Sequence, residues 1–186
     1  DSGGVAAIVS SQTGLVAVGA SPWGEFVPTA AVWVSDNGLD WRLVTPRGDG
    51  YRDAYMVDVV DTGDHLVSVG GSPFDTSLLA AWASPDGLTW ERLPSPSNDT
   101  AAEHGYMEAL TITTAAEMLY AFGRDFDAGR SAFQERNALW SSADGLEWMR
   151  VDLEALEGLV PFSISGLGPT EIGFWPPPYW VDDDWV

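Results

Sequence analysis

Short apolar runs alternate with polar turns along the whole chain. The runs are rich in Val, Ala and Trp and are bounded by Gly, Pro, Asp or Ser, as in VAAIV at 5–9 and LVSVG at 66–70. Runs of this kind predict β-strands, because an amphipathic helix would repeat its apolar positions every three to four residues. Helical periodicity is confined to at most a turn or two at 153–159. The pattern therefore predicts an all-β fold.

Four such strands recur as a unit at a spacing of roughly 50 residues. Each unit has an opening apolar strand, a strand that ends in a glycine (Gly19, Gly70 or Gly123), a tryptophan strand and a last strand. This repeat predicts a β-propeller of four-stranded antiparallel blades. We expect one propeller region over 1–186, with blades at 5–46, 54–96 and 106–153 and a truncated or degenerate one at 160–186. About three and a half blades make a partial propeller or part of a larger ring.

Each tryptophan strand runs into a tight turn that is followed by a second tryptophan. We call the segments 33–41, 82–90 and 140–148 the clasps. In the second clasp Pro85 holds φ near −65°, which excludes a type I′ turn. We therefore expect a three-residue loop with Gly87 in the left-handed conformation, which places Trp82 directly opposite Trp90. The residues expected to form the clasps are Trp33, Ser35, Gly38, Trp41, Trp82, Ser84, Asp86, Gly87, Trp90, Trp140, Ser142, Asp144, Gly145 and Trp148.

The clasps resemble the Asp-box, the Ser-x-Asp-x-Gly-x-x-Trp turn of sialidase-like, or BNR-repeat, propellers. Asp36, Gly38 and Trp41 match that motif, although Val34 stands at its serine position. The other two clasps match in glycine and tryptophan, and their aspartates stand one place closer to the glycine, which gives a shortened form of the motif. The resemblance implies a propeller fold, and it implies that the clasps are structural and lie away from any catalytic face.

The strongly acidic composition narrows the range of partners. The chain carries 28 acidic residues against 8 basic ones, all arginine, for a net charge of −20, and it has no cysteine. A charge of this sign argues against binding nucleic acid or anionic lipid, and the lack of cysteine excludes disulfides. No apolar run is long enough to span a membrane as a helix, so we expect no membrane insertion. We expect an exported protein, extracellular or at the cell surface, whose sequence is given from a mature or trimmed start.

The loops between the second and third strands of the blades form the candidate binding face. These loops emerge opposite the clasps, and each carries an aromatic residue at a matching place. Arginines gather on the same predicted face, and exposed aromatic residues beside arginines are typical of binding patches. The candidates are Trp23, Phe74, Phe126, Arg52, Arg124 and Arg130. The alternative is that the aromatic residues pack under their own loops.

Two classes of function remain open. The main expectation is a non-catalytic propeller module, not an enzyme, that binds a protein or glycan or serves as a structural subunit of a surface assembly. The alternative is a sialidase-like glycoside hydrolase that acts on an anionic glycan. The resemblance then implies an arginine triad, but its Phe/Tyr-Arg-Ile-Pro motif is absent, and the nearest fragment, Tyr51-Arg52-Asp53, lacks Ile-Pro.

Cofactors and partners follow from the same sequence. We expect no cofactor; the acidic run Asp182, Asp183 and Asp184 is the alternative, as a calcium site, because calcium prefers carboxylate oxygens. An open array of blades would leave an unpaired apolar edge strand at each end. We therefore expect a protein partner or further propeller blades to cover the ends. The alternative is a small four-bladed ring that is closed by strand exchange between the termini.

Overall fold

The computed structural model describes residues 4–24, 27–44, 49–72, 79–96, 106–126 and 135–153. They form three antiparallel four-stranded sheets, and the expected all-β propeller fold is confirmed. Blade 1 consists of β1 (Gly4–Ser11), β2 (Gly14–Gly24), β3 (Val27–Ser35) and β4 (Arg42–Val44). Blade 2 consists of β5 (Tyr55–Asp61), β6 (Leu66–Gly71), β7 (Ala80–Ser84) and β8 (Glu91–Arg92). Blade 3 consists of β9 (Tyr106–Ala115), β10 (Met118–Phe126), β11 (Glu135–Ser142) and β12 (Met149–Arg150).

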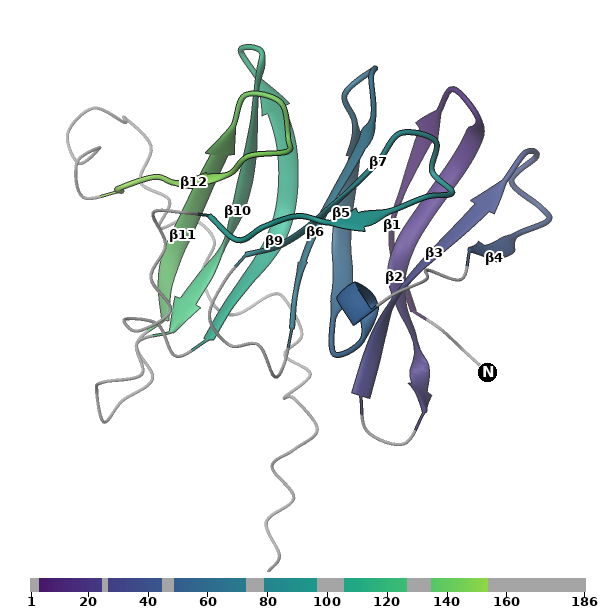
Figure 1. Ribbon diagram of the computed structural model, residues 1–186, viewed down its shortest axis with the longest axis horizontal. Coiled ribbons are helices and arrows are strands. Elements are labelled where there is room, and N and C mark those ends of the chain that lie inside the picture. The colour runs from purple at the N-terminus through teal and green to yellow at the C-terminus, as the bar shows by residue number, and fades with distance from the viewer. Residues whose placement is uncertain are drawn as a thin grey trace, which may run out of the picture. The chain divides into compact units, whose positions relative to one another are not determined.

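Each blade pairs its strands in chain order, and a 3₁₀ helix, η1 (Asp49–Tyr51), precedes blade 2. In Figure 1 the turns β1–β2, β5–β6 and β9–β10 lie at the same end of their blades, and η1 lies toward the other end. Blades 2 and 3 are also joined by one bridge between Gly71 and Glu108. The region beyond 153, where a fourth unit is expected, is outside the described residues.

The first strand of every blade is bulged at the same place. The pairing shifts by one residue between Val5 and Ala7 and between Met56 and Asp58, and β9 shifts at the matching point. The recurring glycine of the second strand lies opposite this bulge. A Cβ at Gly70 would overlap the carbonyl oxygen of Tyr55, so only glycine lets the two backbones approach.

The core lies between successive blades. Val16, Val18 and Val32 of blade 1 pack in one cluster with Trp82 and Met56 of blade 2. The opposite side of blade 2 packs in the same way on blade 3, in the cluster that holds Val67, Val69, Ala81, Trp140 and Trp148. The blades therefore stack face to face. Our expectation of open edge strands is wrong in this respect, because a missing neighbour leaves a sheet face uncovered rather than a strand edge.

The clasps also differ from the predicted register. Trp82 lies opposite Arg92, and Ala83 lies opposite Glu91, so Trp82 and Trp90 are not a cross-strand pair. Trp33 lies opposite Leu43 and Trp140 opposite Arg150 in the other two clasps. The loop of the second clasp is two residues longer than predicted, because Trp82 pairs with Arg92 and not with Trp90. Its backbone groups bond to loop side chains instead of to the ladder, and the guanidinium of Arg92 lies 5.8 Å from the Trp82 ring centroid.

Candidate functional site

The clasp loops are closed by side-chain hydrogen bonds. Gly87 has φ +73°, the left-handed conformation that the sequence predicts. The Ser84 hydroxyl oxygen accepts a hydrogen bond from the Gly87 amide at 2.8 Å. Asp86 Oδ1 accepts from the amides of Leu88 and Thr89 at 2.8 and 2.6 Å. Trp90 Nε1 donates to the Gly87 carbonyl at 3.0 Å.

The other two clasps repeat this arrangement, with Asp144 in blade 3 and Asn37 in blade 1 as the acceptor. Burial would raise the pKa of Asp86, but hydrogen bonds from Thr89, Leu88 and Ser84 outweigh it and lower the pKa below its usual value. Hydrogen bonds from the amides of Leu146 and Glu147 likewise lower the pKa of Asp144. Both carboxylates are thus held ionised as caps of their own loops, which is a structural role.

Clasps also fasten one blade to the next. Thr13 Oγ1, in the β1–β2 turn, donates to the Asp86 carbonyl of the following blade at 3.1 Å. Gln12 Nε2 donates to the carbonyl of Gly63 at 2.9 Å. A Cβ on Gly87 would come within 2.9 Å of Val16 Cγ2. The glycine therefore lets the clasp lie directly on the preceding blade.

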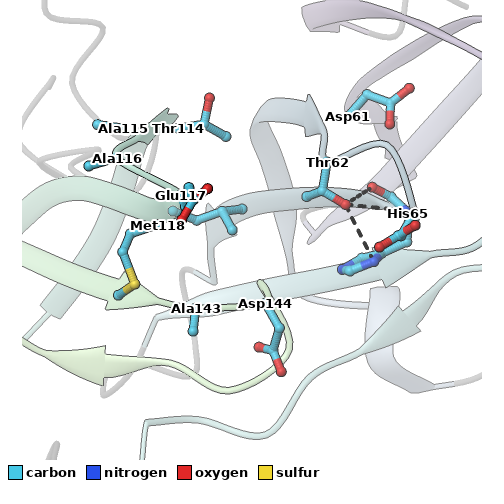
Figure 2. Close-up of a pocket in the computed structure, with 12 residues that line it drawn as sticks. Asp61, Thr62, His65, Thr114, Ala115, Ala116, Glu117, Met118, Ala143 and Asp144 are labelled. Carbon is cyan, nitrogen blue, oxygen red and sulfur yellow. Dashed lines mark hydrogen bonds between the residues drawn. The ribbon is translucent and has the colours of Figure 1, made fainter.

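An acidic hollow opens on the clasp side between blades 2 and 3. Its volume is about 530 Å³, and Figure 2 shows the β5–β6 turn on one side and the β9–β10 turn and third clasp on the other. Asp61, Asp64, Glu117 and Asp144 line it together with His65. His65 Nδ1 lies 3.4 Å from Thr62 Oγ1.

The described side chains around the hollow are not arranged as a metal site. Nε2 of His65 is buried and has no hydrogen-bond partner among the described residues. The carboxylate of Asp144 accepts hydrogen bonds from the amides of its own loop. Within the described part of the chain, no three His, Asp or Glu side chains are placed to hold a metal ion.

Asp58 lies on the first strand of blade 2, and both of its carboxylate oxygens accept hydrogen bonds. Its Oδ2 accepts from Thr111 Oγ1 at 2.7 Å and from the Ile112 amide at 2.9 Å, both on blade 3. Its Oδ1 accepts from the Val59 amide at 2.8 Å. Asp58 therefore joins two blades and is not available to a ligand.

The segment that leads into β5 has a backbone that is anchored on both sides of Arg52 and Asp53. Tyr51 is buried, and its hydroxyl donates to the carbonyl of Trp90. Burial, with Glu91 nearby, raises the pKa of Tyr51 to about 12. The Ala54 amide donates to the Pro28 carbonyl at 3.2 Å, and Arg52 bridges to Thr29 at the start of β3.

Arg52 and Asp53 lie between these two anchors. Arg52 is exposed and Asp53 is half-buried, with φ +60°. A non-glycine residue with positive φ is uncommon, although Asp tolerates it better than most. The backbone of Arg52 and Asp53 is thus held on both sides, just before the first strand of blade 2.

Of the predicted binding face, the structure describes the side chains of Arg52 and Arg124 only, and they belong to different segments of the fold. The side chains of Trp23, Phe74, Phe126 and Arg130 fall outside the described set, as do Asp182, Asp183 and Asp184. Arg124 is half-buried on β10, opposite Asn137. Sequence reasoning gave Asp53 and Asp58 no role, and that of Asp58 depends on its contacts with blade 3. The one local signal was the Asp-Ala step just before an apolar strand.

Compared by sequence, the chain matches no family model and no curated protein. Its structure is similar to that of the GH32 β-fructofuranosidase of Bombyx mori, with a TM-score of 0.52 and 16% identity over 80% of this chain and 35% of that one. An α-L-arabinofuranosidase from Fusarium graminearum, in complex with an iminosugar inhibitor, gives 0.51 and 18% over 78% and 47%. Sucrose-6-phosphate hydrolase from Lactobacillus gasseri gives 0.51 and 10% over 78% and 34%.

The chain thus spans from about a third to about half of the length of these enzymes. At such identities the likeness shows the propeller fold. It contradicts our expectation of a protein without enzymatic activity, since these similar propellers belong to glycoside hydrolases. Among the described residues, no helix has the length and apolar character to cross a membrane.

Proposed function

We propose that this chain is part of a glycoside hydrolase propeller that acts on furanoside-containing carbohydrate. The observation that carries the proposal is the match of its three blades to propellers named as a β-fructofuranosidase and an α-L-arabinofuranosidase. The net charge of −20 supports a neutral glycan over the anionic glycan of a sialidase, because like charges repel.

The substrate site of this proposal is the face opposite the clasps, at Arg52 and Asp53. Hydrolysis of a glycosidic bond uses a pair of carboxyl groups, one of which donates a proton to the leaving oxygen. Asp53 is exposed enough to reach a ligand, and its backbone is fixed by its neighbours, whereas Asp58, Asp86 and Asp144 are occupied by hydrogen bonds. We assign Asp53 to this pair and Arg52 to binding sugar hydroxyls.

Hydrolysis of sucrose and of an aryl α-L-arabinofuranoside, with an aryl sialoside as comparison, tests the proposal. We expect turnover of a furanoside and none of the sialoside. Asp53→Asn should reduce kcat at least about 100-fold, the usual size of a general acid–base contribution. Asparagine tolerates positive φ, so the fold should be unaffected. Asp64→Asn, in the clasp-side hollow, is the matched control and should keep full activity.

Absence of both turnover and furanoside binding, in the 186-residue chain and in the protein isolated from its source, would contradict the proposal. Equal activity of the Asp53→Asn and Asp64→Asn variants would instead show that the site does not include Asp53.

We also propose that the clasps are shortened Asp-boxes and that the protein works outside the cell. Fractionation of source cells, with detection by antibody, tests that location.

A further inference from the structure

One face of blade 1 is apolar and is not covered by the described residues of the other blades, although the same face of those blades is buried. Ile8 lies opposite Ala17, as Val59 lies opposite Ser68 and Ile112 opposite Ala121. Ile8 is 56% exposed, whereas Val59 is 5% and Ile112 is 4% exposed. Val5 is 52% exposed, and its counterpart Met56 is 1% exposed.

The clasp tryptophans show the same contrast. Trp41 is 37% exposed, whereas Trp90 and Trp148 are 7% and 3% exposed. The local structure of Trp41 is nevertheless that of the other two, because its Nε1 donates to the Gly38 carbonyl at 3.2 Å. Its exposure thus comes from a missing neighbour and not from a different fold. We call Val5, Ile8, Leu15, Trp33 and Trp41 the open face.

The two covered copies show what this surface binds. In both, the preceding blade lays small aliphatic side chains on it: Val16, Val18 and Val32 on blade 2, and Val67, Val69 and Ala81 on blade 3. We propose that the open face binds a further four-stranded blade that presents Val or Ala at the positions of Val67, Val69 and Ala81. Closed propellers have about four to eight blades, so such a partner also continues the ring.

The first clasp supplies an independent observation. A Cβ at Gly38 would meet only Leu15 of its own blade, at 3.4 Å, whereas Gly87 and Gly145 lie against Val16 and Val67 of the preceding blade. The space over Gly38 is therefore vacant where a valine of a preceding blade would lie. In the second clasp the carbonyl of Asp86 accepts a hydrogen bond from Thr13 of the preceding blade. The carbonyl of Asn37 holds the same place in the first clasp, so it is where a preceding blade would donate.

The experiment supplies such a blade in the same polypeptide. A copy of residues 55–107 is placed directly before Gly4, and hydroxyl-radical oxidation of Trp41 and Ile8 is measured by mass spectrometry. The copied segment does not contain the peptides of these two residues, so the readout is unambiguous. We expect oxidation of Trp41 to fall to the level of Trp148, which occurs once in the fused chain, but not to do so in the 186-residue chain.

The matched control carries Val69→Asp in the copied blade only, and it should leave Trp41 as reactive as in the 186-residue chain. A fused chain that misfolds, or that leaves Trp41 reactive, overturns the proposal.

Two further measurements test whether the open face binds something other than a separate blade. Light scattering on the 186-residue chain tests for a second copy of the chain. Self-association lost with Ile8→Glu, but kept with Leu88→Glu, would identify a second copy as the occupant. Protection of Trp41 by arabino- or fructo-oligosaccharides would identify a glycan. Either result overturns the proposal of a separate blade.

Discussion

At the scale of single residues, each clasp is defined by one glycine and one polar acceptor. The glycine has positive φ in all three clasps, at +75°, +73° and +78° in chain order. The acceptor is Asn37 in the first clasp and an aspartate in the other two. Because the three copies differ in their neighbours and in charge, they serve as controls for one another.

Gly87→Ala should destabilise the protein more than Gly38→Ala. Both substitutions put a Cβ on left-handed backbone, at a cost of about 1–2 kcal/mol. At Gly87 the new Cβ would also lie 2.9 Å from Val16 Cγ2, whereas at Gly38 the nearest atom is Leu15 Cδ1 at 3.4 Å. Overpacking adds about 1–3 kcal/mol, so the difference should exceed about 1 kcal/mol. Urea unfolding monitored by circular dichroism measures it, and equal losses would contradict the blade-to-blade contact at Gly87.

Asp86→Asn should leave the free energy of unfolding at pH 7 nearly unchanged. In acid, the variant should lose less of this stability than the wild type does. The amide oxygen still accepts from Leu88 and Thr89, as Asn37 does from Leu39 and Asp40 in blade 1. The pKa of Asp86 is lower in the folded protein than its ordinary value near about 3.9. Its stabilisation is therefore present above that value and is lost as the pH falls through the folded pKa.

Urea unfolding of both proteins between pH 7 and 3 measures this dependence. The free energy of unfolding of the wild type should fall more steeply below about pH 4 than that of Asp86→Asn. Asp86→Ala is the comparison that removes the acceptor, and it should cost about 1 kcal/mol already at pH 7. Parallel pH profiles for wild type and Asp86→Asn would show that the carboxylate charge contributes nothing.

At the scale of elements, the sequence predicts the strands and the repeat well, and the loops less well. Alternation and turn residues determine the four strands of each blade, and a glycine at positive φ follows from the turn chemistry. The loop length was predicted wrongly, since the reasoning at Pro85 counted only hydrogen bonds of the strand ladder. In the structure, Ser84 and Asp86 bond the loop amides themselves, which allows two more residues in the loop.

Asp58→Ala should destabilise the pairing of blades 2 and 3 by about 2 kcal/mol. The substitution leaves the Ile112 amide without its charged acceptor, and a hydrogen bond to a charged group contributes about 1.5–3 kcal/mol. Asp61→Ala, on the same strand, removes only an exposed bond to the Gly63 amide and should cost less than about 1 kcal/mol. Thermal unfolding and amide hydrogen exchange at Ile112 measure both. Unchanged exchange at Ile112 in Asp58→Ala would argue against a bridging role.

At the scale of the whole molecule, fold and site are predictable to different degrees. Three copies of one pattern specify a propeller, because each copy repeats the same local signal. The proposed site depends on contacts between segments that lie far apart in the sequence, because the backbone at Arg52 and Asp53 is held by Tyr51 and Ala54, which bond to different blades. The predicted binding face, Arg52 included, stays a prediction, and sequence reasoning gave Asp53 no role; the non-catalytic interpretation is contradicted by the similar enzymes.

The net charge gives the last prediction. With 28 acidic and 8 basic residues, the folded chain repels itself, and unfolding moves the charges apart. Salt shortens the range of this repulsion, from about 30 Å at 0.01 M to about 3 Å at 1 M. The Tm at pH 7 should therefore rise with ionic strength, and by the same amount in sodium chloride as in choline chloride. Calorimetry measures both series. A Tm that is flat in salt would show that the repulsion is already balanced within the fold, and a rise with sodium alone would indicate a bound cation instead of screening.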